Sequence, residues 1–153
     1  MRNSHIAVFI HYVWSTWDRL PLLTGEVERA VYRQIGDKCA ALGAELVALG
    51  GVDDHVHLLV QAPATISFAD FMNHVKGASS HLATHEVLAG KQFFKWQGSY
   101  AAFSVSPRHR DAVVNYIKRQ REHHAGGTII RAYEPDAWEP RGGGGATGGG
   151  KHT

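Results

Sequence analysis

The stretch Ala44-Glu-Leu-Val-Ala-Leu-Gly-Gly-Val-Asp-Asp-His-Val-His-Leu-Leu-Val-Gln61 decides the fold class of this chain. Its two halves are rich in branched apolar residues, and each half is too short for a typical buried helix. The acidic pair Asp53-Asp54 separates them, as polar turn residues separate two strands. The stretch therefore predicts a hairpin or tight sheet connection between strands at 44–52 and 55–61.

A helix is predicted on each side of this hairpin. Before it, residues 24–42 begin at the capping residue Thr24, end before Gly43, and repeat apolar side chains at helical spacing. After it, residues 67–88 repeat apolar side chains at the same spacing behind Ser67. We expect both helices to pack on one face of the sheet.

Two further strands and a last helix complete the pattern. Apolar and aromatic residues predict a central strand at 5–14 and a short strand at 101–106. Pro107 suits the first turn of a helix that we expect to run to about His124. The predicted order β-α-β-β-α-β-α is that of an α+β fold with a ferredoxin-like split βαβ antiparallel sheet, helices on one face and an appended C-terminal helix.

The composition excludes several classes of protein. The 153 residues are 44% hydrophobic and 20% charged, which suits one globular domain. No run approaches the about 20 apolar residues of a membrane span, and the first residues lack the layout of a signal peptide, so we expect a cytoplasmic protein. The single cysteine, Cys39, allows neither an intramolecular disulfide nor a thiolate zinc site. Metal ligands would have to be His, Asp, Glu or Gln.

His55 and His57 are the first candidates for metal ligands. Because side chains alternate along a strand, both imidazoles point to one face of the sheet, whereas Val56, Leu58 and Val60 point to the other. Two imidazoles at this spacing can share a divalent cation. They could equally cover an open sheet face, and the His-x-His pattern alone does not decide between the two.

Tyr116 and Gln120 are one turn apart on the predicted last helix. In a continuous helix they share the border of the apolar stripe, while Lys118, Arg119 and Glu122 point to solvent. A tyrosine at such a border is most often a packing residue, and a glutamine there is most often solvated. Neither residue indicates a function by itself.

The two motifs together resemble a known family. The segments Asp53-Asp-His-Val-His-Leu-Leu-Val60 and Tyr116-Ile-Lys-Arg-Gln-Arg-Glu-His-His124 are similar to those of the HUH-type tyrosine transposases of the insertion-sequence 200/605 group and of the related REP-associated tyrosine transposases. The resemblance covers about residues 5–125 in the right order. Three more segments look family-like: Pro21–Thr24, Lys76–Ser80 and Trp96–Ser106.

The resemblance implies a DNA transposase with a metal-assisted tyrosine nucleophile. His55, His57 and Gln120 would hold one Mg²⁺ or Mn²⁺, and Tyr116 would attack a phosphate of single-stranded DNA at hairpin-marked element ends. A tyrosine hydroxyl has a pKa near 10 and needs such help at neutral pH. Cleavage would leave a 5′-phosphotyrosine link and a free 3′-OH, which are rejoined by transesterification without a nucleotide cofactor.

The resemblance also sets expectations for assembly and organisation. We expect a nucleoid-associated homodimer in which the tyrosine helix of one subunit completes the histidine site of the other. Residues 1–125 would be the catalytic domain. Residues 126–141, where the periodicity fades, would be a C-terminal extension, and 142–153 a flexible glycine-rich tail.

Contacts to DNA are predicted where basic and aromatic residues come together. The net charge of +2 is too small to indicate a nucleic-acid-binding protein by itself. Lysines can meet phosphates and aromatic rings can stack on unpaired bases, although each such residue could also be a solvated or core residue. The candidates are Arg19, Lys76, Lys91, Lys95, Trp96, Tyr100 and Arg119.

Two other functions stay open at this point. A metal-dependent phosphodiesterase would use His55 and His57 with Asp53 or Asp54 and an activated water, and would form no covalent adduct with DNA. A domesticated, non-catalytic module would bind nucleic acid without cleaving it, and its histidines would be structural.

The other histidines receive weaker assignments. His123 or His124 could protonate the leaving 3′ oxygen, although a histidine at a helix end more often meets exposed carbonyls. Three histidines share one predicted helix face and are interpreted as a polar surface: His74, His81 and His85.

Overall fold

The computed structural model describes residues 4–127 and 133–134, and its core is one four-stranded antiparallel sheet in the order β2-β3-β1-β4. This order confirms the ferredoxin-like α+β fold. The strands are β1 (Phe9–Ser15), β2 (Glu45–Gly51), β3 (His55–Gln61) and β4 (Ala101–Val105). The helical segments are η1 (Trp17–Arg19), α1 (Gly25–Ala41), α2 (Phe68–His81), η2 (Leu82–Val87), η3 (Pro107–His109), α3 (Arg110–Lys118) and α4 (Gln120–Gly126).

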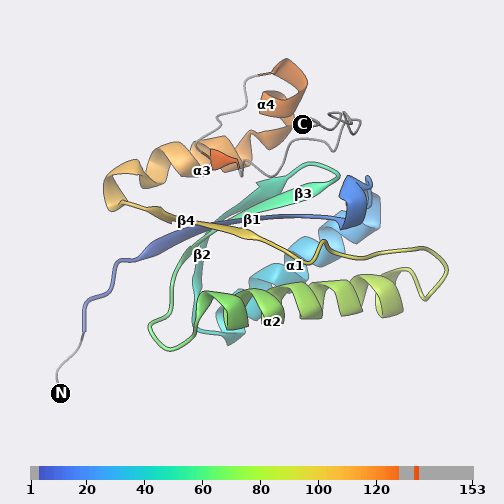
Figure 1. Ribbon diagram of the computed structural model, residues 1–153, viewed down its shortest axis with the longest axis horizontal. Helices are drawn as coiled ribbons and strands as arrows, with labels where there is room; N and C mark the ends of the chain where they lie inside the picture. The colour runs from blue at the N-terminus through green and yellow to red at the C-terminus, as the bar shows by residue number, and fades with distance from the viewer. Residues whose placement is uncertain (1–3, 128–132, 135–153) are drawn as a thin grey trace, which may run out of the picture.

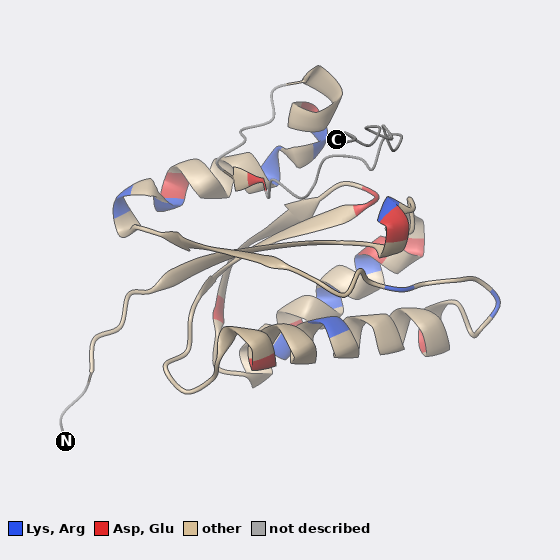
Figure 2. Cartoon of the chain, in the orientation of Figure 1, with Lys and Arg blue, Asp and Glu red and all other residues tan. Residues whose placement is uncertain are grey.

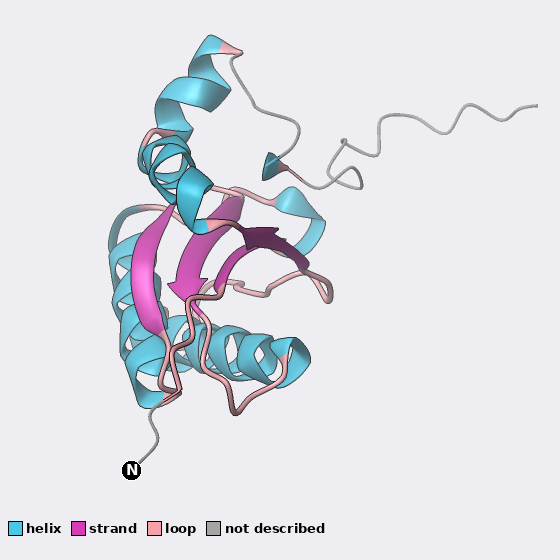
Figure 3. Ribbon diagram, turned by 90° about the vertical axis from the view of Figure 1, so that its left-hand side faces the viewer, coloured by secondary structure: helices cyan, strands magenta, loops and turns pink. Residues whose placement is uncertain are grey.

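Helices cover both faces of the sheet, in three layers. Figure 1 shows α1 and α2 on one face and α3 with α4 on the other, and Figure 3 shows the sheet between these layers. Alternation along the strands divides the side chains between the two faces. Leu58 of β3 belongs to the apolar cluster under α1 and α2, whereas the adjacent Leu59 packs with Val113 and Ile117 of α3. Both leucines are fully buried.

Most predicted boundaries agree with the structure to within a few residues. Strand β1 begins at Phe9 rather than at residue 5, because its partners β3 and β4 end opposite Phe9, at Gln61 and Val105. Ser67 caps α2, as predicted, by accepting a hydrogen bond from the backbone N–H of Asp70 at 3.2 Å.

The prediction of one continuous last helix is wrong. Helix α3 ends at Lys118, and α4 begins at Gln120, because Arg119 adopts φ −107° and ψ 25°, outside the helical range. The placement of Tyr116 and Gln120 at the border of the stripe is wrong too. They are 2% and 1% exposed, respectively, so both are fully buried. Lys118 and Arg119 are exposed, as predicted.

A close approach of backbones fixes α3 on the sheet. A Cβ atom at Gly50 of β2 would lie 2.4 Å from the carbonyl oxygen of Ile117. Only glycine permits this distance. The absence of a side chain at residue 50 therefore sets how closely the helix that carries Tyr116 can lie against the sheet.

Two features concern the rest of the molecule. Among the described residues, no helix is long and apolar enough to cross a membrane. Figure 2 shows charged residues mainly on the helices and loops, whereas the central strands β1 and β3 carry none. The predicted tail at 142–153 and most of the predicted extension at 126–141 lie outside the described residues.

Candidate active site

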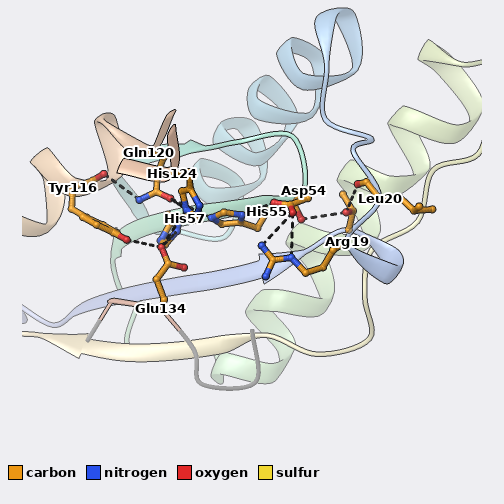
Figure 4. Close-up of polar contacts among 10 residues, drawn as sticks. Arg19, Leu20, Asp54, His55, His57, Tyr116, Gln120, His124 and Glu134 are labelled. Atoms are coloured by element: carbon orange, nitrogen blue, oxygen red, sulfur yellow. Dashed lines mark hydrogen bonds and ion pairs between the residues drawn. The ribbon is translucent and has the colours of Figure 1, made fainter. Parts of the chain in front are cut away.

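The candidate site lies where β3 meets α3 and α4 (Figure 4). His55 and His57 project from β3 to the same side, as the strand period predicts, and neither is exposed to solvent. Their rings meet edge to face with centroids 5.1 Å apart. Helices α3 and α4 bring Tyr116 and Gln120 over these imidazoles. The structure thus brings together the four residues that the resemblance implies.

Asp54 fixes the orientation of His55. Its Oδ1 lies 2.7 Å from His55 Nδ1, and its Oδ2 lies 3.2 Å from the Arg19 Nε, which donates to it. Burial alone would raise the pKa of Asp54, but the hydrogen bond and charge of His55 and the charge of Arg19 outweigh burial and lower it. An ionised Asp54 that accepts from Nδ1 leaves the Nε2 of His55 to face the site, as in many metal centres.

His11 plays the corresponding role for His57. The Nε2 of His11, on β1, lies 2.8 Å from His57 Nδ1, and both rings are buried. Burial, together with the nearby His57, lowers the pKa of His11 to about 3, so that His11 stays neutral. Burial also lowers the pKa of His57. A neutral His11 can accept the Nδ1 proton of His57 and leave the Nε2 lone pair of His57 facing the site.

Gln120 joins the two helices to this histidine pair. Its side-chain Nε2 donates to the carbonyl oxygen of Tyr116 at 3.3 Å, which indicates that the other end of the amide is the oxygen. That oxygen lies 3.2 Å from His55 Nε2 and 3.1 Å from His124 Nε2. Gln120 therefore presents an acceptor to the same space as the imidazoles.

The hydroxyl of Tyr116 donates to Glu134 Oε1 at 2.6 Å. The same oxygen lies 3.2 Å from His57 Nε2 and 3.6 Å from His124 Nε2. Burial alone would raise the pKa of Glu134, but contacts from His124, His57 and Tyr116 outweigh it and lower the pKa. Glu134 is therefore ionised and ties the tyrosine to the histidines.

The residues present fit a divalent cation. One ligand atom from each of His55, His57, His124 and Glu134 can be chosen so that all four lie within 4.8 Å of one another. Glu134 Oε2 is buried without a hydrogen-bond partner, and His57 Nε2 has only its 3.2 Å contact with Glu134 Oε1, which leaves both atoms able to bind another group. A cation held there would satisfy both atoms. Imidazole with oxygen ligands suits Mn²⁺ better than Mg²⁺, which prefers oxygen alone.

A cavity of about 540 Å³ adjoins the site. It lies beside the start of α1, and His124 of α4 and Asp54 form part of its wall. Two arginines line it, each paired with a carboxylate: Arg19 with Asp54, and Arg121 with Glu28 at 2.7 Å. The cavity therefore meets the site at Asp54 and His124.

The structure assigns different surroundings to the predicted DNA contacts. Trp96 is only 5% exposed and donates its Nε1 hydrogen to Ser79 Oγ, so its ring is not accessible to a base. The ammonium of Lys76 donates to the carbonyl oxygens of Gln97 and Ser99, and burial lowers its pKa.

The remaining predicted contacts lie nearer to solvent. Lys91 and Arg119 are exposed, and Arg19 pairs with Asp54 beside the site. Lys95 is exposed and lies over the ring of Trp17, 4.1 Å from its centroid. Tyr100 is half-buried, with its ring against Tyr12. The three histidines interpreted as a polar surface are exposed, on α2 and η2: His74, His81 and His85.

Sequence patterns did not indicate a role for His11 or Glu134. His11 interrupts an apolar strand, and a polar residue in such a run is a signal that it needs a buried partner. Glu134 lies in a stretch without periodicity, so no sequence signal linked it to the site. Asp54 and His124 were noted, but for other roles.

Known proteins match this chain over most of its length. The model of the family described as "Transposase IS200 like" matches residues 4–120. The ISDra2 transposase TnpA of Deinococcus radiodurans is 30% identical over 118 residues, which cover 73% of this chain and 83% of that protein.

Two solved structures share the fold. A crystal structure of a candidate transposase from Deinococcus radiodurans R1 superposes with a TM-score of 0.62 and 30% identity, covering 78% of this chain and 96% of that one. The REP-associated tyrosine transposase bound to a REP hairpin gives a TM-score of 0.60 over 84% of this chain and 74% of that one. At 14% identity the second likeness supports the fold alone. The family match spans both histidines of β3 as well as Tyr116 and Gln120, and on its extent this chain belongs to the IS200-like transposases.

Proposed function

We propose that this transposase cleaves and rejoins single-stranded DNA at hairpin-marked ends, with Tyr116 as the nucleophile. One observation carries the proposal: the Tyr116 hydroxyl and the Nε2 of His57 both contact the same oxygen of Glu134, at 2.6 and 3.2 Å. The phenol of Tyr116 therefore lies beside the proposed metal ligands. This is the arrangement that a metal-assisted attack on a phosphate requires.

The family is metal-dependent. The resemblance assigns the ion to His55, His57 and Gln120, and the side chains of His124 and Glu134 lie close enough to the same imidazoles to complete its coordination. A divalent cation there would supply an electrophile that stabilises the charge developing on a phosphate oxygen. Asp54 and His11 hold the two imidazoles by contacts to their Nδ1 atoms, so that both Nε2 atoms face the site.

The covalent step would be carried out by Tyr116. Its oxygen forms a bond to phosphorus, and the bond from phosphorus to the 3′ oxygen breaks. The DNA is then linked to the protein through a 5′-phosphotyrosine, and attack by a 3′-OH reverses the step and rejoins the strand. His124, whose side chain is 22% exposed, lines the cavity and is a candidate for protonating the 3′ oxygen.

A phosphodiesterase that uses Asp54 is less well supported. The carboxylate of Asp54 is directed to Nδ1 of His55 and to Arg19, and so it positions an imidazole. A covalent adduct separates the two functions, because a hydrolase forms none.

The test uses single-stranded oligonucleotides that carry candidate end hairpins, incubated with Mn²⁺ and the full chain. We expect a protein–DNA adduct that survives denaturing electrophoresis, with the phosphate mapped to Tyr116 by mass spectrometry. The perfectly paired duplex should not react. Products without any adduct would contradict the transposase mechanism, and binding without cleavage would indicate a non-catalytic module.

We also propose a homodimer with shared sites. Within one chain Tyr116 already lies beside His57, with ring centroids 5.8 Å apart. An identical helix from a partner could occupy the same surface, since exchanged elements reuse existing contacts. Mixing the Tyr116→Phe and His57→Ala proteins tests this idea. Adduct carried by the His57→Ala chain supports shared sites, whereas no recovery despite proven subunit exchange would require sites built within one chain.

A further inference from the structure

Glu134 is a buried carboxylate whose Oε2 could meet a cation, but the proposed function assigns no role to its other oxygen, Oε1. It lies beyond residue 120, where the match to the family ends, and its side chain is 8% exposed. Figure 4 shows Glu134 reaching toward Tyr116 and His57. This chain therefore adds a charged group to its site from outside the segment that it shares with the family.

The contact between Glu134 and Tyr116 is short and involves the reacting atom. A separation of 2.6 Å is typical of a hydroxyl that donates to an ionised carboxylate. The donor is the oxygen that would attack the phosphate, and the acceptor can bind a proton. His123 contacts the tyrosine differently: its ring stacks on the phenol with centroids 4.7 Å apart, so that it meets the face of the ring.

We propose that Glu134 is a further catalytic residue, which aims the Tyr116 hydroxyl and accepts its proton during the attack on DNA. This inference rests on the proposed role of Tyr116. As the tyrosine oxygen bonds to phosphorus, its O–H bond breaks and the proton passes to Glu134 Oε1. The bond to the 3′ oxygen breaks with its electron pair on that oxygen, which takes a proton from solvent, directly or through His124. Glu134 then returns its proton to solvent, and no proton is gained or lost overall.

Glu134 lies outside the cavity beside the site. The cavity is walled by residues such as Asp54 and His124, and neither Tyr116 nor Glu134 lines it. The carboxylate therefore does not fill the space that the cavity offers to a ligand.

The first test replaces Glu134 with glutamine in the full chain. Glu134→Gln keeps the size of the side chain and an acceptor oxygen, but it binds no proton. We expect adduct formation in a single turnover to slow by about 100-fold, at the low end for loss of a general base. Binding of the hairpin, measured by fluorescence anisotropy, should not change. Glu122→Gln on the exposed side of α4 removes an equal charge and should react at the wild-type rate.

The second test separates proton transfer from a structural role. Difluorotyrosine is placed at position 116, because its phenol is more acidic and depends less on a proton acceptor. If Glu134 takes the proton, the loss caused by Glu134→Gln should be about tenfold smaller with this residue than with tyrosine. An equal loss with both residues would reduce Glu134 to a structural role and overturn the inference.

Two further outcomes would also contradict the proposed role of Glu134. Glu134→Gln that reacts as fast as wild type or faster would mean that the carboxylate is idle or obstructs the site. If wild type itself forms no adduct with any hairpin substrate, the proposed function of Tyr116 is wrong, and the role of Glu134 fails with it.

Discussion

The two faces of the sheet are both buried, yet they bury different chemistry. The face under α1 and α2 is apolar and aromatic, with Trp14 of β1 fully buried and Tyr12 stacked on Phe71 of α2. The face under α3 buries a smaller apolar cluster together with three imidazoles, those of His11, His55 and His57. Neighbouring residues on the same strands belong to opposite faces.

The difference between the two faces shows that in this small domain one face of the sheet mainly stabilises the fold, whereas the other carries the candidate site. The apolar face stabilises the fold in proportion to the area it removes from water. Buried imidazoles contribute less, because losing water costs free energy unless each polar atom finds a partner. On the α3 face, Asp54 and His11 supply such partners, and His57 Nε2 meets Glu134 Oε1 at 3.2 Å, whereas Glu134 Oε2 has no hydrogen-bond partner. That oxygen is a candidate ligand for a cation.

The largest difference in activity between the two faces should come from removing a tyrosine hydroxyl on each. Tyr116→Phe removes the nucleophile, so adduct formation should disappear while hairpin binding remains. Tyr32→Phe removes a hydroxyl from α1 that is buried without a hydrogen-bond partner, and adduct formation should be unchanged. Denaturing electrophoresis measures both. A covalent adduct on the Tyr116→Phe protein would place the nucleophile elsewhere.

Loss of the proposed metal should have the next largest effect. His57→Ala, or chelation of the wild type with EDTA, should slow strand cleavage by roughly 10³-fold, because an electrophile worth several kcal/mol is lost. Hairpin binding should persist, since it depends on other contacts to phosphates and bases. His85→Ala, on the exposed surface of η2, is the matched control. Cleavage that resists chelation would exclude a role for the metal.

A smaller effect is expected at the residue that orients His55. Asp54→Asn should weaken Mn²⁺ binding by about 10–100-fold, as loss of a partner to a metal-bound histidine usually does. Titration followed by electron paramagnetic resonance of free Mn²⁺ measures this affinity. Asp53→Asn, at the exposed neighbouring position, should leave it unchanged. Equal affinities for all three proteins would show that the Asp54–His55 contact is not needed for the metal.

The smallest effect on activity should come from adjacent leucines that pack on opposite faces. Leu58→Ala and Leu59→Ala should each lower the free energy of unfolding by about 2–5 kcal/mol, measured by urea denaturation. At a temperature where both variants stay folded, only Leu59→Ala should reduce adduct formation, by a few-fold, because it loosens the support of α3. Equal activities would mean that the position of α3 does not depend on this cluster.

Much of the fold could be predicted from local pattern. Period-two and helical spacings gave the four strands, α1 and α2, because those segments each bury one side against the sheet. The break at Arg119 could not be predicted, since residues 110–125 contain neither glycine nor proline. The break is fixed instead by contacts between residues that are distant in the sequence, such as the one between Gln120 and His55.

The candidate site shows the same division. The spacing of His55 and His57 predicted a shared face, and the resemblance added Tyr116 and Gln120. The groups that contact these residues could not be predicted from local pattern. His11, for example, meets His57 only through the pairing of β1 with β3. Glu134 reaches the site from a stretch with no periodicity at all. Long-range contacts of this kind leave no trace in a local pattern.

The close approach at Gly50 predicts which mutations a genetic screen would recover. Its missing side chain lets the carbonyl of Ile117 approach β2, so any other residue there must push α3 away from the sheet. A screen for loss of transposition should therefore recover substitutions at residue 50 in proteins whose histidines and tyrosine are all intact. Second-site suppressors of such alleles should map to the buried side of α3, where smaller residues would let the helix settle back.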